Sequence, residues 1–131
     1  MSVKASALGV RMSPRKVREV ASLVRGRTVA EAMVILSHTP RRAAVPVQKV
    51  IASAKANAEH NSNMRPDSLR ITEISVSVGP RIKRFRPAAQ GRALPFQRKL
   101  SHIFVTVDGE ERKKPVKAEA KVADAPKKEA K

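Results

Sequence analysis

The chain contains 131 residues, a length typical of one domain with appendages, and carries a formal net charge of +17. This positive charge predicts a polyanionic partner, of which nucleic acid is the commonest. The absence of cysteine excludes disulfides and thiolate metal sites and fits a reducing compartment. No apolar run approaches the length of a membrane span, and the first residues lack the apolar core of a secretory signal. We therefore expect a cytoplasmic protein without a membrane partner.

The first elements in the chain are a short strand and a helix. Residues 2–12 show no helical period, and we expect a strand there. Ser13 and Pro14 predict a helix start, because Ser can cap a helix and Pro suits its first position. Gly26 predicts its end. The apolar stripe of this helix has the spacing i, i+3, i+4, i+7 and consists of Val17, Val20, Ala21 and Val24.

Two more helices follow. Thr28 and Glu31 form a capping box at the start of a short helix that ends near Ser37-His38. A third helix is expected over about 41–60. Pro46 would fall near the end of its second turn, which predicts either a kink or a helix that begins only near Pro46. The expected buried residues of the two helices are Val29, Ala32, Met33, Leu36, Ala43, Val47, Val50, Ala54 and Ala58.

After a turn-rich loop, the chain is strand-like from Leu69 to Val78, and a returning strand is expected over Ile103–Val107. The apolar residues change parity between Ile71 and Ile74. Because side chains alternate along a strand, this change predicts a β-bulge near Thr72-Glu73.

The segment between these two strands, residues 79–102, contains seven Lys/Arg and no Asp or Glu. If extended, it projects basic side chains from both faces. Two arms of about a dozen residues reach roughly 35–40 Å, whereas a domain made from the rest has a radius of gyration of about 12–13 Å. The segment therefore projects as a ribbon or is ordered only by a partner. Because like charges at this density repel, an anionic partner should stabilise it.

The aromatic residues are three Phe. Phe85 and Phe96 lie in the basic segment and either stack on nucleic-acid bases or pack across the ribbon from each other. Phe104 is then the only aromatic available to the core. The core is expected to be built from Val, Ile, Leu, Met and Ala.

The composition changes at Asp108, beyond which Ala, Lys, Glu and Pro dominate. Such a segment cannot bury enough apolar area to offset its ordering entropy. We expect one domain, residues 1–107, which includes a β-hairpin over 79–102, followed by a disordered tail, residues 108–131. The tail is either simply solvated or acts as a basic arm.

The sequence shows no catalytic constellation. His38, His60 and His102 are far apart along the chain, and the five glycines form no phosphate loop. We expect no enzymatic activity, no metal and no cofactor. Hydrogen bonds to the backbone or to phosphate are the expected role of His60 and His102.

Several motifs occur together in this chain. They are Ser13-Pro14-Arg15-Lys16-Val17-Arg18, Arg25-Gly26, Ala56-Asn57-Ala58-Glu59-His60-Asn61, Gly79-Pro80, Lys83-Arg84, Pro87, Gly91-Arg92-Ala93 and Ser101-His102-Ile103. In their order and spacing, from about Ala5 to Val107, they resemble the bacterial large-ribosomal-subunit protein family numbered twenty-two.

The resemblance implies an α+β fold of three helices packed on a three-stranded antiparallel sheet, with a long protruding β-hairpin. It implies a structural constituent of the large ribosomal subunit that binds 23S rRNA and supports assembly. The globular part would lie near the exit of the nascent-peptide tunnel, and the hairpin tip would line the tunnel. The implied partners are 23S rRNA, neighbouring large-subunit proteins and the nascent polypeptide.

Positive charge and resemblance together yield a set of predicted site residues. Arg41 and Arg42 are excluded, because a charged helix face is usually just solvated. The predicted rRNA-binding residues are Ser13, Arg15, Lys16, Arg18, Arg25, His60, Asn61, Arg81, Lys83, Arg84, Arg86, Arg92, Arg98, Lys99 and His102. The predicted tunnel-lining tip, carried over by position, consists of Ile82, Lys83, Arg84, Ala89, Gln90, Gly91 and Arg92.

Two competing interpretations remain open from the residues. The chain could be a DNA-compacting or general nucleic-acid protein that places its arm in a groove and its tail along phosphates. It could also be an enzyme with an unrecognised site. Cell fractionation separates the first alternative from a ribosomal protein, and a pH-dependent turnover that requires His60 would support the second.

Overall fold

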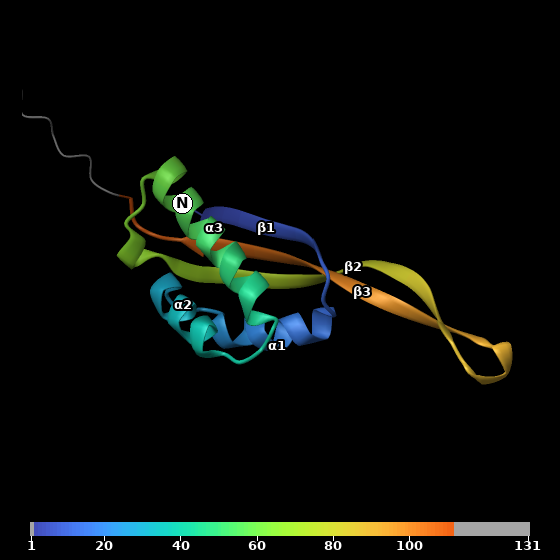
Figure 1. Ribbon diagram of the computed structural model, residues 1–131. Coiled ribbons are helices and arrows are strands. Elements are labelled where there is room, and N and C mark those ends of the chain that lie inside the picture. Colours follow the sequence, from blue (N-terminus) through green and yellow to red (C-terminus); the bar gives the residue numbers. More distant parts are fainter. Residues whose placement is uncertain (1, 112–131) are drawn as a thin grey trace, which may run out of the picture.

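Three helices cover one face of a three-stranded antiparallel sheet in the computed structural model, which describes residues 2–111 (Figure 1). Two strands continue beyond the sheet as a long ribbon, so the predicted α+β fold with a protruding hairpin is confirmed. The elements in chain order are β1 (Ser2–Val10), α1 (Pro14–Val24), α2 (Val29–His38), α3 (Ala44–Ser62), η1 (Pro66–Ser68), β2 (Arg70–Pro87), η2 (Ala89–Gly91) and β3 (Ala93–Asp108). Of the expected tail, residues 108–131, Asp108 is the last residue of β3 and Glu111 forms an isolated bridge with Met64. The part from position 112 onward lies outside the described residues.

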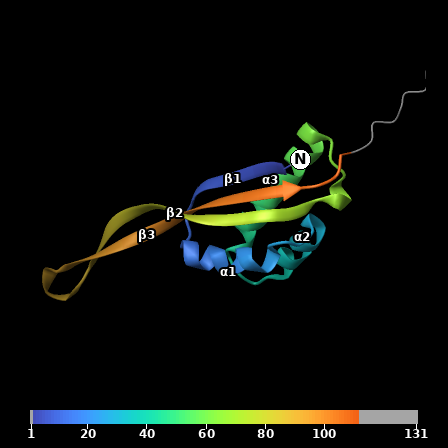
Figure 2. The same ribbon diagram turned by 180° about the vertical axis from the view of Figure 1, so that it is seen from behind.

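The strand order is β1-β3-β2, so β3 is the central strand. Ile103, Val105 and Val107 are fully buried on the face of β3 that meets the helices. Phe104 lies between Ile103 and Val105 in sequence and therefore points to the opposite face of the sheet, which no helix covers. Figure 2 views the molecule from the side of this open face. The Phe104 side chain is 38% exposed. The expectation that Phe104 serves the core was wrong, and the core of residues 2–111 is entirely aliphatic.

The predicted stripes of α1 and α2 face the core. All four stripe residues of α1 are buried, and the helix is followed by Gly26 with φ +75°. The expected Ser13 side-chain cap is not formed; instead its carbonyl accepts the amides of Lys16 and Val17. Half of the predicted capping box of α2 is observed: Thr28 Oγ1 accepts the Glu31 amide at 3.3 Å, whereas the Glu31 side chain accepts no bond from the Thr28 amide within residues 2–111.

The third helix begins at Ala44, later than the 41–60 range, and Pro46 is its third residue. In the first turn a proline ring displaces no hydrogen bond, because those amides have no intrahelical acceptor. Of the two alternatives for Pro46, the late start is therefore the one observed. The helix packs its predicted alanines and valines on β1 and β3.

Two irregularities interrupt the pairing of β2 with β3. The first lies between Ile71 and Glu73 and confirms the predicted bulge. The second places Gly79 and Pro80 opposite Leu100, where the sheet continues into the ribbon. Gly79 is buried, and a Cβ atom there would lie 3.0 Å from the backbone carbonyl carbon of Leu100. Glycine thus allows the two strands to approach at the root of the ribbon.

Ser101 is a buried polar residue on the core face of β3. It is fully buried, and its Oγ atom has no hydrogen-bond partner within residues 2–111. An unpaired hydroxyl in such a position costs free energy, because it loses its bonds to water without replacement.

We therefore expect Ser101→Ala to raise the free energy of unfolding by about 1 kcal/mol. Urea denaturation of the full chain measures the change. Ser77→Ala, on the exposed part of β2, is the matched control and should change stability little. A clear loss of stability in Ser101→Ala would show that the hydroxyl has a partner in solution.

Candidate nucleic-acid interface

The ribbon pairs Arg81–Pro87 with Ala93–Lys99 and closes through η2. Gln90 and Gly91 adopt positive φ angles of 59° and 68° in this turn, which suits glycine and is tolerated by few other residues. All seven cations of residues 79–102 are exposed. None of them forms an ion pair with any residue between positions 2 and 111. The ribbon therefore presents uncompensated positive charge.

The strand register separates most of these charges from one another. Among seven registered pairs, only Arg81 and Lys99 place two cations directly opposite. The remaining cations of the ladder oppose uncharged residues: Lys83 faces Gln97, Arg84 faces Phe96, Arg86 faces Leu94 and Arg98 faces Ile82. Since directly opposed like charges destabilise a strand pair, this register lowers the repulsion within the ribbon.

The two ribbon phenylalanines point to opposite faces. Phe85 opposes Pro95 and Phe96 opposes Arg84, and neighbouring pairs of a ladder alternate between the faces. The alternative in which the two rings pack on each other is therefore wrong. The Arg86 guanidinium carbon lies 5.8 Å from the Phe96 ring centroid, a cation–π distance. Phe85 is 72% exposed, and base stacking remains a prediction for it.

The predicted tunnel-lining tip is only partly brought together. Residues 89–92 lie in and beside the closing turn. Ile82, by contrast, pairs with Arg98 near the root of the ribbon, and Lys83 and Arg84 are the next two residues along β2. This predicted set is therefore distributed along the ribbon.

Two adjoining hollows flank the turn Arg11–Ser13, which joins β1 to α1. The first, of about 600 Å³, lies between this turn and the ribbon root and is also lined by Ile82, Arg84, Gln97, Arg98, Lys99 and Leu100. We call it the root cleft. The second, of about 440 Å³, lies between the same turn and the start of α3 and is also lined by Lys16, Arg41, Arg42 and Ala43.

These hollows unite five of the predicted binding residues, from distant parts of the sequence: Ser13, Lys16, Arg84, Arg98 and Lys99. Sequence reasoning missed Arg11, which lines both hollows, and set aside Arg41 and Arg42. Arg11 belongs to no motif; its only signal was its place just before the helix start at Ser13-Pro14.

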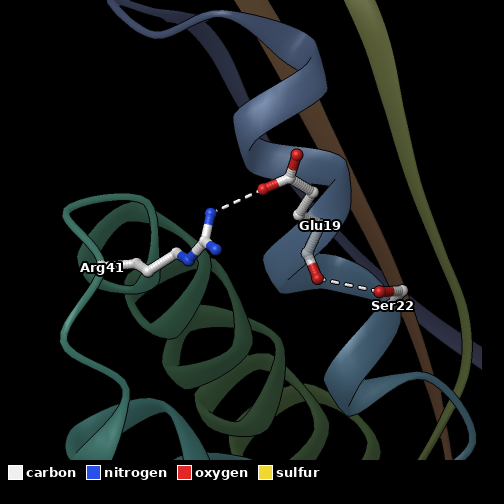
Figure 3. Close-up of polar contacts among 3 residues, drawn as sticks. All are labelled: Glu19, Ser22 and Arg41. Atoms are coloured by element: carbon white, nitrogen blue, oxygen red, sulfur yellow. Dashed lines mark hydrogen bonds and ion pairs between the residues drawn. The ribbon is translucent and has the colours of Figure 1, made fainter.

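The first turn of α1 carries Arg15 and Lys16 and no acidic residue. The positive end of the helix dipole disfavours cations there, so this turn gains from a bound anion. Glu19, the nearest acid on the helix, is engaged elsewhere: its carboxylate accepts from Arg41 at 2.6 Å (Figure 3). Its backbone carbonyl accepts the Ser22 hydroxyl at 2.8 Å. Arg15 and Lys16 have no acidic partner among residues 2–111.

Arg18 and Arg25 bind the outer edge of β2. Arg18 donates from Nε and Nη2 to the Val76 carbonyl at 3.2 and 3.1 Å, and Arg25 donates to the Ile74 carbonyl at 3.1 Å. These contacts satisfy carbonyls that β2, an edge strand, leaves unpaired. The two predicted binding residues therefore attach α1 to the sheet, and RNA contact remains a prediction for them.

The predicted histidine sites are separated in the structure. His60 and Asn61 are exposed at the C-terminal end of α3, where Nδ1 of His60 and Oδ1 of Asn61 lie 3.3 Å apart. His102 is on β3, and its Nδ1 accepts the Gly9 amide at 3.0 Å. The predicted backbone hydrogen bond of His102 is thus observed.

Acidic residues gather at the end of the sheet where β2 begins and β3 ends. Asp67, Asp108 and Glu110 line a hollow of about 720 Å³ there, together with Arg70. The ribbon leaves the sheet at the other end (Figure 1). Positive charge is therefore concentrated toward the ribbon.

Within residues 2–111, no group of three or more His, Cys, Asp or Glu is placed to hold a metal ion. No helix in the same range is long and apolar enough to cross a membrane.

Residues 5–108 match the model of the family described as ribosomal protein L22p/L17e. The chain belongs to the ribosomal protein L22p/L17e family. A similar relative is the large ribosomal subunit protein uL22 of Oceanobacillus iheyensis, 54% identical over 107 residues, which span 82% of this chain and 95% of the relative. The family match includes the ribbon, both hollows and nearly all of the sheet.

In this member of the L22p/L17e family, we expect Arg18→Gln to lower the free energy of unfolding by about 0.5–1 kcal/mol, because two hydrogen bonds to the Val76 carbonyl are removed. Urea denaturation provides the measurement. Arg15→Gln, which removes the same charge without a backbone contact, is the control and should leave stability unchanged or raise it slightly, because it relieves a cation at the positive end of the helix dipole. Equal stability of the two variants would contradict an anchoring role for Arg18.

The His102 contact predicts a tautomer. Since Nδ1 accepts a hydrogen bond from the Gly9 amide, the neutral imidazole carries its own proton on Nε2. Long-range ¹H–¹⁵N NMR correlations should show this form. His102→Asn keeps a comparable acceptor and should leave the hydrogen-exchange rate of the Gly9 amide unchanged, whereas His102→Ala should accelerate the exchange. A dominant Nδ1–H tautomer would contradict the contact.

Proposed function

We propose that the protein is a non-catalytic structural constituent of the large ribosomal subunit that binds 23S rRNA. Family membership and the name of the uL22 relative support this role. The observation that carries it is the ribbon, whose cations are exposed on both faces and have no acidic partner among residues 2–111. A surface of this kind is suited to being enclosed by a folded polyanion rather than by water.

Binding follows from the chemistry of the exposed side chains. Each Lys or Arg that neutralises a phosphate releases a condensed counterion, so affinity falls steeply with salt. Arginine can also bridge phosphates through its two-pronged guanidinium group or stack on unpaired bases. A ribbon with cations on both faces connects RNA segments on either side of it, which supports a role in subunit assembly.

We also propose where the protein lies within the large ribosomal subunit. The globular part lies near the exit of the nascent-peptide tunnel, in the cytoplasm and beside neighbouring large-subunit proteins. The outer ribbon, with Lys83, Arg84 and residues 89–92, lines the tunnel and faces the nascent polypeptide. The length of the ribbon supports this arrangement, since seven registered pairs separate the closing turn from the sheet.

Replacing residues 81–99 with a short Gly-Ser turn tests the role of the ribbon. Because the buried core lies outside this segment, we expect the shortened protein to keep its fold, measured by circular dichroism and thermal melting. Affinity for large-subunit RNA should fall. The logarithmic slope of affinity against salt should also become shallower, by about 0.7–0.9 for each phosphate that the shortened protein no longer neutralises. Subunits assembled with it should mature slowly.

A control for position is the substitution of Arg65 and Arg70 by Gln, which removes two exposed cations at the end of the molecule away from the ribbon. This variant should keep most of the affinity and normal assembly. Normal subunits with the ribbon deleted would count against the proposal. Cell fractionation of the intact protein adds an independent test, since recovery with the nucleoid instead of large subunits would favour the DNA-compacting alternative.

A further inference from the structure

The root cleft differs from the rest of the basic surface because it has apolar walls. Met12, Ile82 and Leu100 all line it, and each is half-buried. Elsewhere on the ribbon the cations stand on exposed strands without such walls. A phosphate group gains nothing from aliphatic side chains, so a ligand for this cleft must bring an apolar surface as well as negative charge.

The rim of the cleft carries three cations and no acidic residue. Arg11 stands on one side, and Arg84 and Arg98, which share a face of the ribbon with Ile82, stand on the other. Ser13 adds a hydroxyl group that can donate and accept hydrogen bonds. The volume, about 600 Å³, falls within the range of roughly 300–1,000 Å³ that is typical of sites for small ligands.

A nucleotide matches this combination of features. Its base is flat, with two apolar faces and a polar edge, and its phosphates are anionic. In an RNA duplex the base faces are covered by stacking, and only an unpaired nucleotide can insert its base between side chains. The second hollow shares the Arg11–Ser13 turn and adds Lys16 and Arg42, so it continues the path for the adjoining phosphates.

We propose that the root cleft binds a single unpaired nucleotide of RNA. The base enters between Met12, Ile82 and Leu100, and the flanking phosphates contact the surrounding cations. This inference rests on the proposed RNA-binding function and adds the class of RNA feature recognised: an extruded base at the ribbon root, not a continuous duplex.

The test compares three short RNAs that differ at one position: a duplex with one bulged adenosine, the same duplex with an abasic bulge, and the fully paired duplex. Affinity for the full chain is measured at one fixed salt concentration, because charge alone binds all three. We expect the bulged adenosine to bind at least about fivefold tighter than the abasic bulge, because burying the faces of one base against aliphatic side chains removes apolar area from water.

Two substitutions in the walls of the cleft locate the effect, and a third substitution outside the cleft is the control. Ile82→Ser should abolish the preference for the bulged adenosine, and Met12→Ser provides a second wall variant if Ile82→Ser unfolds the protein. Leu94→Ser removes an exposed aliphatic residue of the ribbon outside the cleft and should keep the preference. Thermal melting establishes that each variant is folded.

The outcomes separate this inference from the function on which it rests. Equal, salt-dependent binding of the three RNAs would overturn the nucleotide site and leave RNA binding standing. A preference that survives both wall substitutions would also overturn it. Failure to bind any of the three RNAs would overturn the nucleotide site and would argue against the proposed function as well.

Discussion

The rest of the structure depends on the antiparallel pairing of β2 with β3. This single ladder extends from the pair Arg70–Asp108, beneath the helices, to the pair Pro87–Ala93 beside the closing turn. In the sheet, burial of aliphatic side chains on one face stabilises the pairing. Beyond Gly79 there is no such face, and hydrogen bonds and cross-strand contacts alone hold the ribbon. The core therefore fixes the direction and the strand register of a ribbon that has no core of its own.

The charged residues have different roles in the ribbon and in the globular part. The register lets most ribbon cations oppose uncharged residues, which limits repulsion without reducing the charge available to a partner. On the globular part, Arg18 and Arg25 close the edge of β2, and Glu19 neutralises Arg41. Some arginines thus stabilise the fold, while the ribbon and the first turn of α1 keep theirs unpaired. A high net charge does not mean that every cation serves the same purpose.

Local sequence patterns predicted the helices and strands. Features that depend on contacts between distant parts of the chain could not be predicted in this way. The apolar stripes, the Thr28 cap and the bulge near Thr72 depend on neighbouring residues and were predictable from spacing. The direction of Phe104 followed only once its buried neighbours on β3 were known. The root cleft was beyond prediction, because it joins Arg11 to ribbon residues that the chain brings close only through the β1–β3 pairing. Charge density identified the ribbon cations but did not distinguish anchoring arginines such as Arg18.

The bulge at Gly79 and Pro80 allows the length of the ribbon to change without a change in the core. Its extra residue on β2 takes up a shift in register within the ladder, so changes beyond it need not alter which residues face the helices. Adding one residue to each arm would lengthen the ribbon by about 3.3 Å and would reverse the face to which each side chain of the closing turn points. Adding two residues to each arm would lengthen it by about 7 Å and would keep those side chains on their original faces. Variation in reach is therefore expected to come in steps of about four residues, two on each arm.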